Sequence, residues 1–111
     1  FIRDNGVPVW YWDPDIRSGN LDEVLGSLSD TVYVSVDLDV LDPALMSAVG
    51  TPEPGGMTWH QLVSVLAKVA QSRRIVGFDV CELAPADGPP ACCYAAAKLV
   101  YKLVAYACGS R

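Results

Sequence analysis

The spacing of apolar residues along the chain predicts strands that alternate with helices. Runs rich in β-branched and aromatic residues predict three strands, at 7–12, 31–36 and 74–80. Stretches in which apolar residues recur every three or four positions predict three helices, at 20–28, 58–71 and 91–107. The expected order is β-α-β-α-β-α, so the chain is predicted to be an α/β structure with a parallel sheet and right-handed crossovers.

Two of the predicted helices carry sequence signals for their first residue. Asn20 is followed three residues later by Glu23, and Thr58 by Gln61, which is the spacing of a capping box. The strand at 31–36 is almost wholly uncharged, as expected of a strand covered on both faces. Its open edges predict that the fragment pairs with further chain, either a second copy or another part of the same fold.

Length and composition restrict the classes of protein that the chain can represent. With 111 residues it is one domain or part of one, and 51% hydrophobic residues exclude disorder. No apolar run is expected to reach a membrane span of about 18 to 20 residues, and a net charge of −5 disfavours nucleic acid and anionic lipid. The start at Phe1 resembles neither a leader nor a native beginning. Four cysteines without a C-x-x-C pair predict buried thiols in a reducing cytoplasm.

Acidic residues follow the second predicted strand, where ligands bind in open α/β sheets. Asp37 and Asp39 alternate with apolar residues, so the strand period places both carboxylates on one side. Such a pair repels itself unless a cation compensates it, and hard oxygen ligands suit Mg²⁺, Ca²⁺ or Mn²⁺. A second interpretation stays open, a solvated strand-end turn in which Asp39 or Asp42 caps backbone N–H groups.

The third predicted strand also ends on an acid. Glu82 directly follows this strand and is a candidate for holding a cationic substrate, against the alternative of an ordinary surface glutamate. Asp79, inside the strand, is expected to be a paired structural acid. His60, the only histidine, is expected at the surface in the first turn of its helix, and not as a ligand or base.

Three segments together carry a family resemblance. In order they are SVDLDVLDP at 35–43, GTPEPGGMT at 50–58 and GFDVCELAP at 77–85. They resemble the ureohydrolase family of arginases and agmatinases, from about Gly6 to the end of the chain, with the middle segment more similar to the agmatinase branch. The resemblance implies a three-layer α/β/α arginase-like fold, of which residues 1–111 form a carboxy-terminal part.

The resemblance also implies a chemistry. Asp37 and Asp39 would coordinate two Mn²⁺ ions, and a water made nucleophilic at neutral pH would attack a guanidinium carbon to release urea and an amine. Glu82 would bind the guanidinium, and Thr51 would be a hydroxyl that orients this glutamate. The implied protein is a cytoplasmic, agmatinase-like enzyme of polyamine metabolism that acts on a small guanidino substrate.

The chain also departs from the family pattern. The family's histidine ligand, its D-x-H-x-D segment and its proton-shuttling histidine belong to an amino-terminal half, and His60 matches none of them. The 111 residues alone are therefore predicted to be inactive, and to need that missing half or a homo-oligomer. The alternative is a non-catalytic remnant or assembly module of the same fold.

Two rivals outside the family fit less of the sequence. A nucleotide-sugar glycosyltransferase also uses a D-x-D divalent-cation site, but the chain lacks a glycine-rich or basic cradle for a diphosphate. A phosphatase with an aspartyl nucleophile needs a hydroxyl residue where Leu41 stands.

Overall fold

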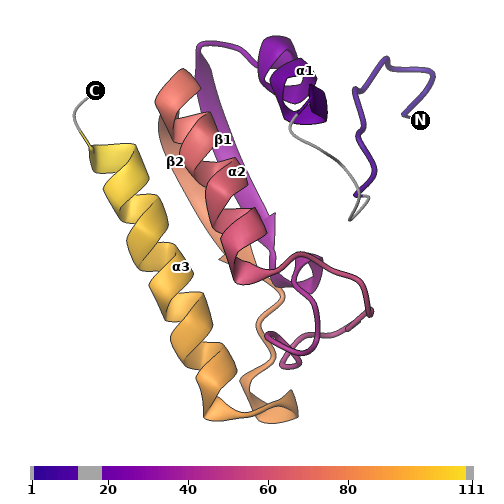
Figure 1. The fold of residues 1–111 in the computed structure, drawn as a ribbon, viewed down its shortest axis with the longest axis vertical. Helices are drawn as coiled ribbons and strands as arrows, with labels where there is room; N and C mark the ends of the chain where they lie inside the picture. Colours follow the sequence, from indigo (N-terminus) through magenta and orange to yellow (C-terminus); the bar gives the residue numbers. More distant parts are fainter. Residues whose placement is uncertain (1, 13–18, 110–111) are drawn as a thin grey trace.

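The computed structural model of the chain describes residues 2–12 and 19–109. Its helices and strands follow the predicted alternation from residue 19 onward (Figure 1). They are α1 (Gly19–Ser27), β1 (Thr31–Asp37), the 3₁₀ helix η1 (Leu38–Val40), α2 (Trp59–Ser72), β2 (Arg74–Cys81), the 3₁₀ helix η2 (Pro85–Asp87) and α3 (Pro90–Cys108).

The start of α2 confirms one capping prediction. The Thr58 hydroxyl accepts a hydrogen bond from the backbone N–H of Gln61, and the Gln61 side chain accepts one from the Thr58 backbone N–H. This reciprocal pair satisfies two N–H groups that a helix start leaves free. By contrast, α1 begins at Gly19, so Asn20 is inside the helix and is not its cap. The structure describes the backbone of Asn20 but not its side chain.

The two strands form a parallel pair that confirms the predicted α/β class. Thr31 is level with Arg74 at one end and Asp37 with Cys81 at the other, so both strands end at the same edge. The register shifts after Val32, which pairs with Ile75, because the next pair skips one residue of β2. This arrangement brings the two acidic segments side by side.

The strand predicted at 7–12 does not form. These residues have no strand partner in the described ranges, and the indole N–H of Trp12 instead donates to the Gly55 carbonyl at 2.9 Å. A β-branched and aromatic run becomes a strand only where a neighbouring strand supplies hydrogen bonds. In place of the first predicted strand there is therefore a segment without regular structure, whose Trp12 contacts the loop that contains Gly55.

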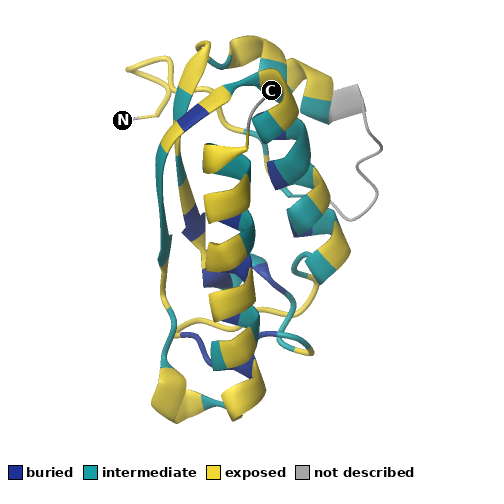
Figure 2. Cartoon of the chain, turned by 90° about the vertical axis from the view of Figure 1, so that its left-hand side faces the viewer, coloured by how far each residue is buried: buried dark blue, intermediate teal, exposed yellow. Residues whose placement is uncertain are grey.

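The sheet is covered on one face only, which corrects the expectation of two buried faces. Figure 2 shows the strands on one side and the helices α2 and α3 on the other. Along β1 only alternate residues approach burial, and Tyr33 on the open face is 63% exposed. The sequence of β1 is as apolar as that of a strand covered on both faces, but the helices of this chain cover only one face of the sheet.

The core lies between the sheet and α2 and α3, and continues under the loops at the strand ends. Its most enclosed side chains come from the segment after β1 and from α3. The side chains with no more than 1% exposure are Leu38, Leu41, Met46, Ala48, Cys92, Leu99 and Leu103. The loops that would carry a site are thus anchored by buried residues.

Helix α3 corrects one statement about membranes. A window of 18 residues within this 19-residue helix has a mean hydropathy of 1.3, so by length and composition alone α3 could cross a bilayer, although Lys98 and Lys102 interrupt its apolar run. A core helix of a globular protein passes the same test, and one side of α3 packs into the core through Leu99 and Leu103. We therefore describe α3 as a packed helix with an apolar outer side.

Candidate metal centre

The chain turns sharply at the end of β1. The Asp37 carboxylate accepts a hydrogen bond from the backbone N–H of Asp39 at 3.0 Å and so caps η1. This corrects the expectation that Asp37 and Asp39 lie on a continuing strand, because Asp39 already belongs to the 3₁₀ helix. A hydrogen bond, and not strand alternation, joins the two acids.

The two oxygens of the Asp39 carboxylate have different surroundings. Oδ2 accepts hydrogen bonds from the Thr51 backbone N–H, at 3.2 Å, and from the Thr51 hydroxyl. Oδ1 is buried and has no hydrogen-bond partner among the described residues. A buried acceptor without a partner is costly, so Oδ1 is a position where a cation would be favourable.

Asp42, the third acid of the segment, has a structural role. One of its oxygens accepts from the Ala44 N–H and the other from the Gly55 N–H, both at 2.9 Å. These two hydrogen bonds lower the pKa of Asp42 below its ordinary value. Asp42 therefore closes the loop by capping backbone groups, as the alternative interpretation of this segment predicted for it.

The loop from Gly50 to Gly56 folds back tightly onto the segment after β1. The Met57 N–H donates to the Val40 carbonyl at 2.7 Å, and the Asp42 N–H donates to the Met57 carbonyl at 3.0 Å. A Cβ added at Gly56 would lie 2.6 Å from the Asp42 nitrogen, so only glycine fits there. This close approach fixes the loop that carries Thr51.

Glu82 directly follows β2 and has an unusual backbone. Its φ of 67° makes it the one residue other than glycine with a positive φ in the described part of the chain. Such a conformation costs about 1–2 kcal/mol and is frequent at functional sites. The Glu82 Oε2 atom lies beside Gly50, which precedes Thr51, while the side chain stays exposed. The structure therefore places Glu82 near Gly50, and the residue after Gly50, Thr51, donates hydrogen bonds to Asp39.

The predicted relation between Thr51 and Glu82 differs from the structure. The hydrogen bonds of Thr51 go to Asp39, and none joins it to Glu82 in the described residues. No local sequence pattern indicates the contact between Thr51 and Asp39, because the two residues are 12 positions apart and meet only through the path of the loop. His60 is exposed on α2, as expected.

The open face of the sheet has a second polar cluster. The Ser35 hydroxyl donates to Asp79 at 2.8 Å, and a hydrogen bond to Asp79 raises the pKa of Tyr33, with smaller contributions from partial burial and the negative charge. Asp79 is therefore a paired structural acid, as predicted. Cys81, level with Asp37, was not singled out from the sequence; partial desolvation and then the nearby carboxylates raise its pKa.

The donor set fits two ligand positions of a divalent-cation centre. Asp37 and Asp39 offer hard oxygen ligands, and the orphaned Oδ1 of Asp39 supports a role for this carboxylate in cation binding. Within residues 2–12 and 19–109, no group of three or more histidine, cysteine, aspartate or glutamate side chains could hold a metal. The described residues thus offer two candidate oxygen ligands and no complete ligand set.

Comparison with known proteins decides the family. A sequence model described as the arginase family matches residues 8–106. The chain belongs to the arginase family. Over 103 residues it is 45% identical to the N(1)-aminopropylagmatine ureohydrolase of Thermus thermophilus, a match that covers 92% of this chain and 35% of that protein.

Solved structures of the arginase family support the same assignment. Proclavaminate amidino hydrolase from Streptomyces clavuligerus matches with a TM-score of 0.73 and 33% identity, over 80% of this chain and 30% of that one. Arginase from Bacillus caldovelox matches with a TM-score of 0.76 and 25% identity, over 99% and 38%. This arginase-family chain spans about a third of the length of these relatives, and the α/β fold expected from the sequence is confirmed.

Proposed function

We propose that the chain is a carboxy-terminal portion of an agmatinase-like amidinohydrolase, which hydrolyses a guanidino compound such as agmatine to urea and an amine. The observation that carries the proposal is the buried Oδ1 of Asp39, which has no hydrogen-bond partner in residues 2–12 and 19–109. It lies beside Asp37, at the edge where Glu82 follows the neighbouring strand. The family assignment and the relatives named as ureohydrolases support it.

Asp37 and Asp39 are the residues that would hold the metal. Their oxygens suit Mn²⁺, of which the complete site would hold two, and such ions supply a water that is nucleophilic at neutral pH. Thr51 positions Asp39 by donating two hydrogen bonds to Oδ2, which leaves Oδ1 for the cation. Thr51 therefore acts through Asp39 in this proposal, and not through Glu82.

Glu82 is the proposed substrate contact. Its carboxylate accepts no hydrogen bond within the described residues and is exposed, so it is available to a guanidinium in a charge-assisted contact. The positive φ of Glu82 fixes the direction in which its side chain leaves the end of β2. Binding at this position would orient the guanidinium carbon toward the acids at the end of β1.

We further propose that these 111 residues are inactive alone, in a cytoplasmic protein whose complete site needs the rest of a ureohydrolase domain or a homo-oligomer. Two carboxylates leave most positions around two ions to water, which predicts weak metal binding. The same observation favours the second candidate, a non-catalytic module of the same fold, which would bind no guanidino compound even when complemented.

The test combines Mn²⁺ calorimetry with urea release from agmatine, on the chain alone and with the co-expressed amino-terminal two thirds of the Thermus thermophilus relative. We expect weak Mn²⁺ binding and no turnover alone, and urea release on complementation. Asp39→Ala should abolish Mn²⁺ binding and Glu82→Gln should spare it. Tight binding with turnover by the chain alone would contradict the incomplete site, and complementation that restores Mn²⁺ binding without urea release would favour the non-catalytic module.

A further inference from the structure

A short segment, residues 48–51, runs between the two acidic strand ends. Gly50 lies beside the carboxylate of Glu82, since a Cβ added at Gly50 would be 3.6 Å from Oε2. The next residue, Thr51, donates two hydrogen bonds to Asp39. The position of these two adjacent residues therefore decides how the proposed guanidinium contact lies relative to the proposed metal ligand.

The first half of the segment is attached to the chain that follows β2. The Ala84 N–H donates to the Ala48 carbonyl at 2.8 Å, and Val49 and Leu83 form an antiparallel bridge. Ala48 and Val49 are also buried, with 0% and 4% exposure. Because close-packed interiors transmit displacements, a buried and hydrogen-bonded segment moves together with its partner. The position of the segment is therefore set from the β2 side.

Gly88, which follows η2, packs directly against Ala48. A Cβ added at Gly88 would lie 2.7 Å from the Cβ atom of Ala48 and 2.9 Å from its Cα and N atoms. The backbone of Gly88 is extended, with a φ of −159°, which other residues also adopt. Glycine is therefore required at this position by the closeness of Ala48, and not by backbone conformation.

We propose that Gly88 is a positioning residue that acts through Ala48. By fixing the 48–51 segment, it sets the distance between the Glu82 carboxylate and Asp39. The inference rests on the proposed function, which gives these two acids their roles. It predicts that a change at Gly88 alters the site in a chain that is still folded.

The first measurement is hydrogen exchange of the Thr51 amide in the metal-free chain. Gly88→Ala should displace Ala48 and speed this exchange by more than about threefold, because the hydrogen bond to Asp39 then opens more often. The amide of Leu99, in the core part of α3, reports whether the variant is folded and should stay protected.

The second measurement is Mn²⁺ affinity by calorimetry on the same samples. Gly88→Ala should weaken Mn²⁺ binding by about fivefold, which is the effect of losing about one hydrogen bond. The double variant Ala48→Gly/Gly88→Ala should recover part of this loss, because it removes the nearest of the three atoms that the new Cβ meets.

Ala48→Gly alone tests the same link without a clash, in case Gly88→Ala does not fold. It removes a fully buried methyl group and frees the backbone of the segment. Exchange of the Thr51 amide should therefore be faster in this variant too.

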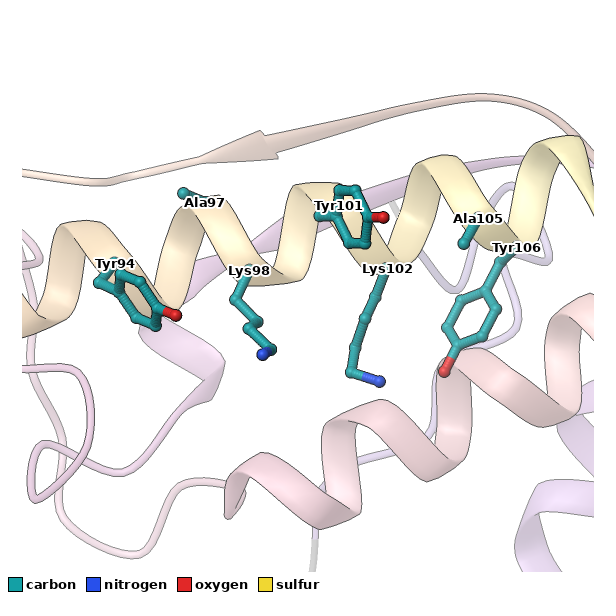
Figure 3. A pocket seen from close by; sticks show the side chains of 7 residues that line it. All are labelled: Tyr94, Ala97, Lys98, Tyr101, Lys102, Ala105 and Tyr106. Atoms are coloured by element: carbon teal, nitrogen blue, oxygen red, sulfur yellow. The ribbon is translucent and has the colours of Figure 1, made fainter.

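Two controls separate positioning from a general loss of stability. Gly109→Ala introduces a similar clash, 2.8 Å from the Ala105 carbonyl oxygen, at the end of α3 that lies away from the acidic strand ends (Figure 1). Ala97→Gly removes a methyl group from the outer side of α3, beside a hollow of about 540 Å³ that is lined by α3 alone (Figure 3). Both variants should leave Thr51 exchange and Mn²⁺ affinity unchanged.

Unchanged Thr51 exchange in a folded Gly88→Ala variant would overturn the proposal, and so would an equal acceleration in Gly109→Ala. Failure of the proposed function gives a different result. The wild-type chain would then show no Mn²⁺ binding that Asp39→Ala removes, while Thr51 exchange would still respond to Gly88→Ala.

Discussion

The two acidic strand ends of this chain are built in different ways. At the end of β1, Asp37, Asp39 and Asp42 all accept hydrogen bonds from backbone N–H groups, so their carboxylates are held by the main chain. At the end of β2, Glu82 accepts none among the described residues, and its direction follows from a backbone with positive φ. One end is fixed by hydrogen bonds and the other by backbone conformation.

This difference matches the two proposed roles. Ligands of a metal must keep fixed positions when the metal is absent, and backbone donors provide that with little loss of side-chain entropy. A group that binds a substrate must instead keep its hydrogen-bonding capacity free until the substrate arrives. Substitutions in the loop at the β1 end should therefore change stability most, and substitutions of Glu82 should mainly change substrate binding.

Gly56→Ala should have the largest effect. The added Cβ would approach backbone atoms of Val40, Leu41 and Asp42 at 2.6–2.8 Å, and backbone cannot move aside cheaply. We expect a loss of about 3 kcal/mol in the free energy of unfolding, measured by urea denaturation. Mn²⁺ affinity should fall as well, because the loop carries Thr51.

Gly26→Ala is the control for that substitution. Gly26 lies inside α1 with nothing within 4 Å of an added Cβ, so alanine should stabilise the helix by about 0.5–1 kcal/mol. If both variants lost the same amount of stability, the close approach at Gly56 would not be what holds the loop onto the end of β1.

Thr51→Val removes a hydroxyl from the β1 end with little change in shape. The Asp39 Oδ2 atom keeps the Thr51 backbone N–H but loses the hydroxyl donor. We expect a loss of about 1.5 kcal/mol, since hydrogen bonds to charged groups are the stronger ones, together with weaker Mn²⁺ binding. Thr51→Ser should behave like the wild type in both calorimetry and denaturation, and an equal effect of the two variants would argue against the hydroxyl.

At the β2 end, stability and function should move in opposite directions. Glu82→Gly relieves the positive φ and should stabilise the fold by about 0.5–1 kcal/mol, yet it removes the proposed guanidinium contact. In the complemented enzyme, guanidine or agmatine binding should then be lost while Mn²⁺ binding stays. Glu82→Gln keeps the positive φ and should also weaken guanidinium binding. Comparing the two variants therefore separates the effect of the backbone conformation from the effect of the carboxylate charge. Loss of Mn²⁺ binding in either variant would mean that Glu82 has another role.

Local signals in the sequence predicted the regular elements well. The Thr58 and Gln61 pair marked the first turn of α2, and the apolar runs placed β1 and β2 to within a residue. The strand at 7–12 failed because strand formation depends on a partner, which local pattern does not contain. Whether such a segment forms a strand depends on neighbours that are distant in the sequence.

The sequence indicates which residues are candidates for the site, but it does not indicate their contacts. Asp37, Asp39 and Glu82 follow from their places after strands, since parallel strands end at a common edge. The 3₁₀ turn at Asp39 and the hydrogen bond from Thr51 depend on how the loop folds back, which is set by the room left at Gly56. Both features depend on tertiary structure, so they cannot be predicted from the residue types in one segment.

The smallest expected effect is the contribution of Asp42, in the segment after β1, to the pH dependence of stability. Hydrogen bonds from the Ala44 and Gly55 N–H groups lower the pKa of Asp42 in the folded chain, so folding favours its ionised form. This contribution to stability is fully present above the pKa of the unfolded chain and is lost as the pH falls through the lower, folded-state pKa. Asp42→Asn should therefore flatten the decline in unfolding midpoint between about pH 5 and pH 2. Glu53→Gln, in the same loop, should keep the decline, because no described backbone N–H donates to Glu53; a decline that survived in Asp42→Asn would assign the acid sensitivity to another carboxylate.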